Sequence, residues 1–244
     1  MKFTIIFFSV FHTLVWAQSI NLGGVLPVWN QTSKINEKLN YNLYISTIYD
    51  TFDTTVDGVQ YPSSDLQIYI QHSLIYTLNP HWNFSGSYTF IRGNPFLANY
   101  VNEHRIWEQA TYSHTINYGR MVHRLRFEQR FIQNRISNKY PLSTRLRYQL
   151  GYSMPLQGKT LDEKEFYFNT YNEFYFSFTG LKNATYSDNW SYIGSGYNFG
   201  EMGRLELGYL LQTTVRNTQK DLRFLHLLQI MWVTNFDFFV KKKK

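Results

Sequence analysis

The stretch HRLRFEQRF, residues 123–131, decides the fold because charged and apolar residues alternate along it. Arg124, Arg126, Glu128 and Arg130 occupy every second position, with leucine and phenylalanine among the residues between them. Successive side chains of a β-strand point to opposite faces, so this spacing predicts a strand with one charged and one apolar face. Arginines facing lipid would each cost about 2–4 kcal/mol near the bilayer midplane. We therefore expect the charges to point into the lumen of a barrel and the apolar residues to point outward.

The same alternation recurs along most of the chain and predicts ten strands. In DLQIYIQHSLIYTL, residues 65–78, most apolar residues fall on even positions and most polar residues on odd ones. Several segments exceed ten residues, which suits a membrane strand of about 9–11 residues better than a globular strand of about 5–6. The expected strands span residues 38–50, 65–78, 82–91, 103–118, 122–132, 143–154, 164–178, 189–199, 204–214 and 222–238.

The connections between these segments alternate in length. Those after the second, fourth and eighth strands are tight, whereas those after odd-numbered strands tend to be long and polar. This pattern is typical of a single antiparallel up-and-down transmembrane β-barrel with an even strand number, and it predicts both chain ends on the short-turn side. The barrel is expected over residues 38–240, followed by a basic tail at 241–244. Residues 18–37 are interpreted as an N-terminal arm or an additional strand, with twelve strands as the alternative count.

Composition and the N-terminus indicate an exported protein. The 244 residues include no cysteine, carry a formal net charge of +7 and are 17% charged, against about 25% in average domains. The lack of cysteine excludes disulfides and thiolate metal sites. A basic start, an apolar stretch and a small residue at Ala17 predict a signal peptide over residues 1–17. No later apolar run is long enough for a membrane helix.

The polar faces predict a network of paired charges inside the barrel. In a simple hairpin alignment, Glu128 falls opposite or diagonal to Arg145 or Arg147, and such side chains would largely fill a narrow lumen. Two residues, Glu108 and Asn172, fall on the apolar face instead, and the orientation of the strands at 189–199 and 222–238 stays open. The expected lumenal residues are Glu103, Arg105, Trp107, Arg124, Arg126, Glu128, Arg130, Arg145, Arg147, Glu165 and Glu173.

Several motifs together resemble an uncharacterised family of bacterial outer-membrane β-barrels, classed as a domain of unknown function. They are NEHRIWEQA, HRLRFEQRF, TRLRYQLGY, NTYNEFYF, NWSYIGSGYNF, LELGYLLQ and RFLHLLQI, and the resemblance covers residues 36–238. The sequence departs from the family pattern at Trp190, where an arginine is expected, and at its lysine-rich end. The resemblance implies the fold and the location but no reaction. The family positions found here are Glu103, Arg105, Trp107, Arg124, Arg126, Glu128, Arg130, Arg147, Asn172, Glu173, Asn189 and His226.

The sequence predicts a location more clearly than an activity. We expect a monomer in the bacterial outer membrane, with membrane lipid and the barrel-assembly machinery as partners. The charged lumen is interpreted as structural, with binding through the outer loops. A narrow anion-preferring pore and a soluble periplasmic barrel that binds an apolar ligand are the alternatives. No His-x-Ser or other catalytic constellation occurs, the histidine spacing does not fit a metal site, and no nucleic-acid fold is recognisable. We therefore expect no catalysis, cofactor, metal or nucleic-acid binding.

Overall fold

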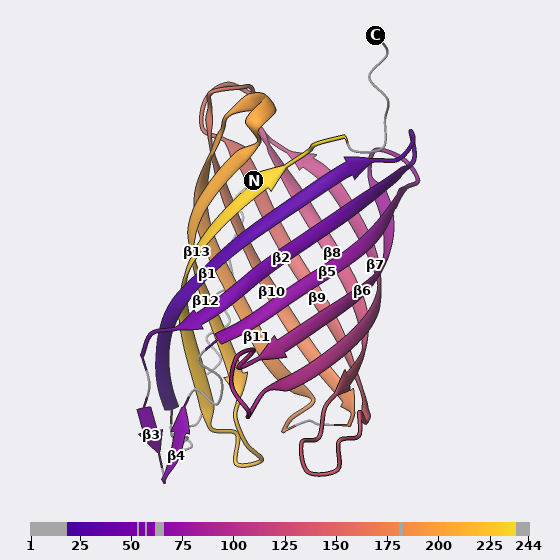
Figure 1. Ribbon diagram of the computed structural model, residues 1–244. Coiled ribbons are helices and arrows are strands. Elements are labelled where there is room, and N and C mark those ends of the chain that lie inside the picture. The colour runs from indigo at the N-terminus through magenta and orange to yellow at the C-terminus, as the bar shows by residue number, and fades with distance from the viewer. Residues whose placement is uncertain (1–18, 53, 57, 62–65, 181–182, 238–244) are drawn as a thin grey trace, which may run out of the picture.

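A computed structural model describes residues 19–52, 54–56, 58–61, 66–180 and 183–237 and shows a closed β-barrel (Figure 1). Eleven strands of 12–16 residues form the barrel wall. They are β1 (Ser19–Lys34), β2 (Leu39–Asp50), β5 (Leu66–Thr77), β6 (Trp82–Gly93), β7 (Val101–Ile116), β8 (Gly119–Ile132), β9 (Leu142–Pro155), β10 (Phe166–Thr179), β11 (Tyr186–Asn198), β12 (Arg204–Val215) and β13 (Leu222–Thr234).

The barrel is an antiparallel meander that closes through one parallel pair. Each strand pairs with its neighbours along the chain, and β1 pairs in parallel with β13 over Ser19–Gln31. An odd number of strands makes this necessary, because the first and last strands of such a meander run in the same direction. The register is continuous through β7, β8 and β9, where Glu128 lies directly between Trp107 and Arg145.

The all-β barrel and the positions of the ten expected strands are confirmed, but the strand count is wrong. Residues 19–34 form an additional strand, β1, so the barrel has eleven strands rather than ten or twelve. This extra strand also corrects the expected position of the chain ends. Ser19 lies beside Leu222, at the end of the barrel that carries the connection between β12 and β13, whereas Thr234 lies at the opposite end.

The two ends of the barrel carry different connections (Figure 1). At the short-turn end, residues 117–118 join β7 to β8, with Asn117 at a φ of 53°, and a 3-10 turn at Gly200–Met202 precedes β12. A longer connection, residues 156–165, lies at the same end. At the loop end, the connection from β2 to β5 contains a small hairpin of β3 (Thr54–Val56) and β4 (Val59–Tyr61). The Tyr61 ring lies under the guanidinium of Arg216, 5.2 Å away.

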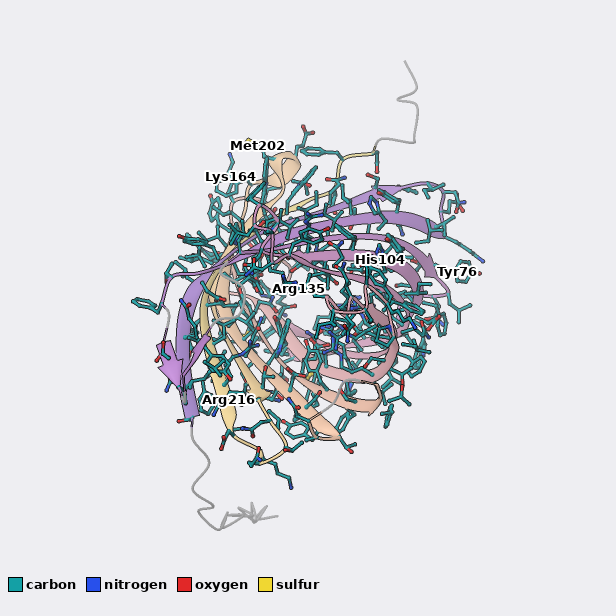
Figure 2. All side chains as sticks on the ribbon, turned by 60° about the horizontal axis from the view of Figure 1, so that its bottom comes forward. Tyr76, His104, Arg135, Lys164, Met202 and Arg216 are labelled. Atoms are coloured by element: carbon teal, nitrogen blue, oxygen red, sulfur yellow. The ribbon has the colours of Figure 1, made fainter. Side chains whose placement is uncertain are left out.

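The side chains on the two faces of the wall differ in the way that the alternation predicts. Figure 2 looks toward the loop end and shows side chains on both sides of the ring of strands, with Tyr76 at the periphery. The interior contains three sectors. Most of the buried charged residues lie on β7–β10, uncharged polar residues on β2, β5 and β6, and a buried apolar cluster on β1 and β11–β13, where the buried Glu206 of β12 accepts a hydrogen bond from Tyr192. The cluster comprises Leu22, Leu26, Val28, Tyr192, Leu210, Leu225 and Leu227.

This apolar sector explains the strands whose orientation the sequence leaves open. On β13, Leu225 and Leu227 point inward against β1, while Leu228 and Ile230 are exposed on the outside. Both faces of the strand are therefore apolar, and alternation alone does not distinguish them. In the described part of the chain, no helix is long and apolar enough to cross a membrane. The expected signal peptide and the basic tail lie outside the described residues.

Candidate functional site

A wall of arginine and glutamate residues on β7–β10 is the candidate site. The register of these strands places Glu128 opposite Arg145, and Arg126 opposite Arg147. Like charges directly opposite each other destabilise a strand pair, so the wall needs carboxylates at neighbouring positions. Three glutamates, Glu103, Glu128 and Glu173, fill these positions, and each has a side chain at most 10% exposed.

Glu128 is the centre of this wall and is fully buried. Its Oε2 accepts hydrogen bonds from Nη2 and Nε of Arg145 at 2.6 and 2.9 Å. Its Oε1 accepts from Nη1 of Arg147 at 2.8 Å and from Nη1 of Arg105 at 3.3 Å. One carboxylate thus bonds three arginines from β7 and β9, and its removal would leave their charges without a common partner.

The other two glutamates extend the network toward the two ends of the barrel. Glu103 binds Arg130 through both carboxylate oxygens, at 2.7 and 2.9 Å, and also accepts from Nε of Arg105 at 2.8 Å. Glu173 on β10 binds Arg147 through both oxygens, at 2.9 and 2.7 Å. Paired, parallel hydrogen bonds of this kind fix the orientation of both partners, so each glutamate holds an arginine in one geometry.

Two arginines on β8 are less completely neutralised. The guanidinium of Arg126 stacks on the Trp107 ring at 3.7 Å and donates to the neutral Oε1 of Gln109 at 2.9 and 2.8 Å. Its nearest carboxylate oxygen, on Glu128, is 4.0 Å away. Arg124 donates from Nη2 to Glu173 at 2.7 Å, but its buried Nε finds no acceptor in the described part of the chain. The wall therefore has positive charge in excess of its carboxylates.

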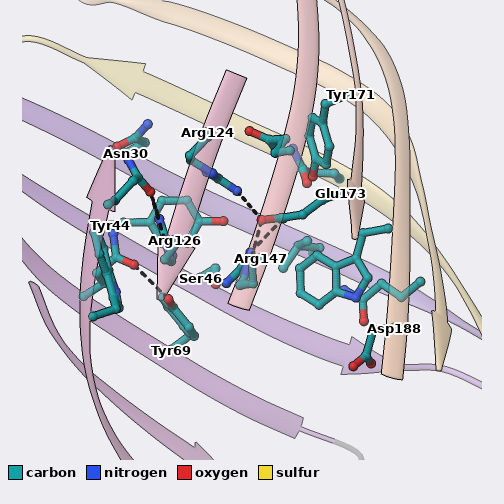
Figure 3. Close-up of a pocket in the computed structure, with 18 of the residues that line it drawn as sticks. Asn30, Tyr44, Ser46, Tyr69, Arg124, Arg126, Arg147, Tyr171, Glu173 and Asp188 are labelled. Atoms are coloured by element: carbon teal, nitrogen blue, oxygen red, sulfur yellow. Dashed lines mark hydrogen bonds and ion pairs between the residues drawn. The ribbon is translucent and has the colours of Figure 1, made fainter. Parts of the chain in front are cut away.

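The wall borders a cavity of about 730 Å³ inside the barrel. Seven arginines and four acidic residues line this cavity, so its surface is cationic overall. Figure 3 shows part of it, with Arg124, Arg126 and Glu173 drawn together with Tyr44 and Tyr69 from β2 and β5. The interior is therefore less completely filled than the sequence analysis expects.

The structure brings together ten of the eleven expected lumenal residues. They are Glu103, Arg105, Trp107, Arg124, Arg126, Glu128, Arg130, Arg145, Arg147 and Glu173. Glu165 is the exception and does not belong to this network. It lies in the connection before Phe166, where its Oε2 accepts from the backbone N–H of Asp162 at 3.0 Å. The sequence predicts a strand from residue 164, but β10 begins at Phe166. The alternation of inward and outward side chains therefore does not apply to Glu165.

Several aromatic and polar residues of the charged wall and the cavity are absent from the expected set. Tyr175, fully buried, donates to Glu173 at 3.1 Å and lies 4.7 and 4.5 Å from the guanidinium carbons of Arg145 and Arg147. Trp190, which is likewise absent from the expected set, lies on the cavity wall. The alternation of β10 provides a signal for Tyr175, because it has the same parity as Glu173. No such signal exists for the residues of β11, where both faces are mixed.

The histidines that the structure describes do not gather into a metal-binding group. Among the described residues, no group of three or more histidine or acidic side chains has the geometry to hold a metal ion. His72 is exposed on the outer face whereas Ser73 is buried, so adjacent residues point apart. His226, a position shared with the family pattern, also lies on the outer face, with its Nδ1 2.6 Å from the hydroxyl of Tyr209.

The fold and this wall define a class of protein: a closed β-barrel with an arginine–glutamate network inside and an apolar outer face. The family model "Protein of unknown function (DUF2490)" matches residues 28–223, and the chain belongs to this family. The match includes every strand of the charged wall. A search of curated proteins finds no significant match.

Proposed function

We propose that this protein is a bacterial outer-membrane β-barrel whose arginine–glutamate network stabilises the lumen. The observation that carries the proposal is the distribution of side chains across the wall. Buried ionic residues lie inside, while large apolar residues are exposed in the middle of strands, among them Ile193 (53% exposed) and Leu207 (54%). A soluble monomer rarely exposes a continuous apolar surface of this extent, whereas lipid favours it.

Aromatic residues at the short-turn end support the same proposal. Tyr76, Trp82, Tyr118 and Trp232 are all exposed near this end of the barrel. Tyrosine and tryptophan are enriched where a membrane barrel meets the headgroups, because their rings are apolar and their N–H or O–H groups are polar. The four residues fit one of the two aromatic girdles of such a barrel.

Several polar groups of the outer face are paired with one another, which further supports contact with lipid. The hydroxyls of Tyr41 and Tyr88 lie 2.6 Å from Nδ1 of His72 and His104, each on a neighbouring strand. Lipid offers no hydrogen bonds, so an unpaired imidazole or phenol would be costly there. Cross-strand pairing satisfies both groups without water.

The two outward polar residues noted in the sequence analysis follow this rule. Glu108 accepts a hydrogen bond from Gln129 at 3.1 Å. The side-chain amide of Asn172 donates to Ser191 at 2.7 Å, and its oxygen accepts from Asn189 at 2.9 Å. Both residues are therefore bonded across strands, which lowers the free-energy cost of placing them beside lipid.

Fractionation of the native host tests the proposed location. A membrane barrel should sediment with outer membranes, require detergent for extraction and migrate differently on a gel before and after boiling. Recovery of the folded protein in the soluble periplasmic fraction would reject the proposal and favour the soluble barrel that binds an apolar ligand.

A narrow anion-preferring pore is the second candidate, favoured by the excess of arginine around the cavity. Rings of arginine favour anion passage through pores. Planar-bilayer recordings of the purified protein separate the two candidates. Steady anion-selective currents would support a pore, and an absence of conductance would support a structural lumen.

A further inference from the structure

The cavity inside the barrel has two chemically different walls. On one side, Arg124 and Arg126 project from β8. On the other, Leu26 and Leu225 project from β1 and β13. In the ring of eleven strands, β8 lies halfway round from the β1–β13 pair. A cationic surface therefore faces, across the same cavity, a surface on which apolar side chains lie beside Arg223.

Several buried hydrogen-bond donors around the cavity have no acceptor among the residues that the structure describes. They are Nε of Arg124, Nε1 of Trp190, Nε2 of Gln212 and Nε of Arg223. Gln212 is only 4% exposed, and it lies directly opposite Trp190 in the β11–β12 pair. Buried polar groups in folded proteins almost always have partners, so several unmatched donors on one cavity indicate a ligand that accepts hydrogen bonds.

The charge of the cavity specifies this acceptor further. Arg126 stacks on Trp107 and donates its hydrogen bonds to the neutral Gln109, while the Glu128 carboxylate lies 4.0 Å away. A stacked guanidinium with free N–H groups suits a carboxylate or phosphate, whose oxygens match its planar donors. The acceptor that best balances the excess positive charge is therefore an oxyanion.

We propose that the cavity binds a small amphipathic anion, with its carboxylate or phosphate group at Arg124 and Arg126 and its apolar part against Leu26 and Leu225. The cavity volume of about 730 Å³ lies within the usual range for small-molecule sites, about 300–1,000 Å³. The apolar wall adds affinity that scales with the buried area of the ligand. The site is independent of membrane insertion, because every group in it faces the barrel interior.

Calorimetry with three matched probes tests the chemistry of the ligand. Hexanoate carries both an anionic head and an apolar tail, acetate carries the head alone, and hexanol the tail alone. For the purified full chain in detergent, we expect hexanoate to bind at least about tenfold more tightly than either fragment, which corresponds to about 1.4 kcal/mol. Hexyl phosphate then shows whether the site prefers phosphate to carboxylate. Equal binding of hexanoate and hexanol, or no saturable binding of hexanoate or hexyl phosphate, would overturn the proposal.

Substitutions then place the ligand in the cavity. Arg126→Gln should weaken hexanoate binding about tenfold or more, equivalent to about 1.4 kcal/mol. Arg135→Gln removes the same charge from an exposed loop and is the matched control. If both substitutions weakened hexanoate binding equally, the binding would reflect general electrostatic attraction, and the proposed site at Arg126 would be rejected.

A second variant keeps the test valid if Arg126→Gln fails to fold. Trp190→Phe removes an N–H group that has no acceptor among the described residues, and it retains an aromatic ring beside Arg147. The variant should still fold, so that its migration on a gel still changes on boiling, and it should bind hexanoate several-fold more weakly. Unchanged affinity in Trp190→Phe, with the fold intact, would contradict the assignment of this donor to the ligand.

Discussion

Replacing Glu128 with glutamine should destabilise the barrel more than any other single loss of charge in the wall. The carboxylate is fully buried and bonds Arg105, Arg145 and Arg147. Glutamine keeps one oxygen acceptor, but its amide group must then face N–H donors of an arginine. The substitution thus removes a negative charge and creates a contact between two donors.

The expected magnitude follows from the cost of leaving a buried charge without its partner. Removing one member of a buried ion pair costs about 3–5 kcal/mol. Two arginines of this cluster keep other carboxylates, Arg105 with Glu103 and Arg147 with Glu173. Arg145 keeps only Asp188, at 3.8 Å. We therefore expect a loss of about 3 kcal/mol in the free energy of unfolding, at the lower end of the range.

Urea unfolding of the barrel in phospholipid vesicles, followed by tryptophan fluorescence, measures this loss by linear extrapolation. Glu201→Gln, in the exposed 3-10 turn, is the control and should change the free energy by less than about 0.5 kcal/mol. In the Glu128→Gln background, Arg126→Gln should restore about 1 kcal/mol, because it removes a like charge without removing a close ion pair. A loss below about 1 kcal/mol for Glu128→Gln would refute the view that this carboxylate organises the wall.

Two further predictions concern the outer face and the close packing of the interior. Leu125→Arg places a charge on the outer face and should lower the free energy of unfolding in vesicles by about 2–4 kcal/mol. The control, Leu156→Arg, lies in an exposed connection and should have little effect. Equal effects of the two substitutions would argue against lipid at Leu125. Gly208→Ala places a methyl group against the Tyr192 ring and should destabilise the same transition by about 1–3 kcal/mol. Gly86→Ala, which meets no atom within 4 Å, should be neutral or stabilising, and a similar loss in both glycine variants would contradict this packing argument.

The sequence predicts which side chains face inward wherever one face of a strand is charged. On β8, four charged residues on alternate positions leave only one orientation with acceptable energy. The same reasoning fails at Glu165, because the strand begins at Phe166 and parity carries no information beyond the strand end. Strand edges depend on hydrogen bonds to neighbours, and alternation does not report those.

The sequence leaves an arm and an additional strand open for residues 18–37, where the structure has β1, and it does not predict the cavity. β1 contains Gly23, Gly24 and Pro27, and its inward residues Leu22 and Leu26 are apolar. The first half of β1 therefore lacks the polar inward face that identifies strands such as β8, and polar cavity residues appear only from Asn30 onward. The cavity depends on which strands lie opposite each other, and that depends on the total strand count and on how the barrel closes. An error of one strand changes which strands lie opposite each other across the barrel. The sequence alone therefore does not assign residues such as Trp190 to a shared site.

The charged wall specifies something that the apolar outer face does not. A two-residue slip of β10 against β9 retains the inside–outside pattern, because side chains repeat with a period of two. In the native register, Glu173 lies opposite Gln149 and hydrogen-bonds Arg147 and Arg124. A slip in one direction would place it opposite Gly151, away from Arg147 on the same strand. The apolar pattern therefore predicts which face points outward, whereas the ionic network distinguishes the native register from this even-numbered alternative.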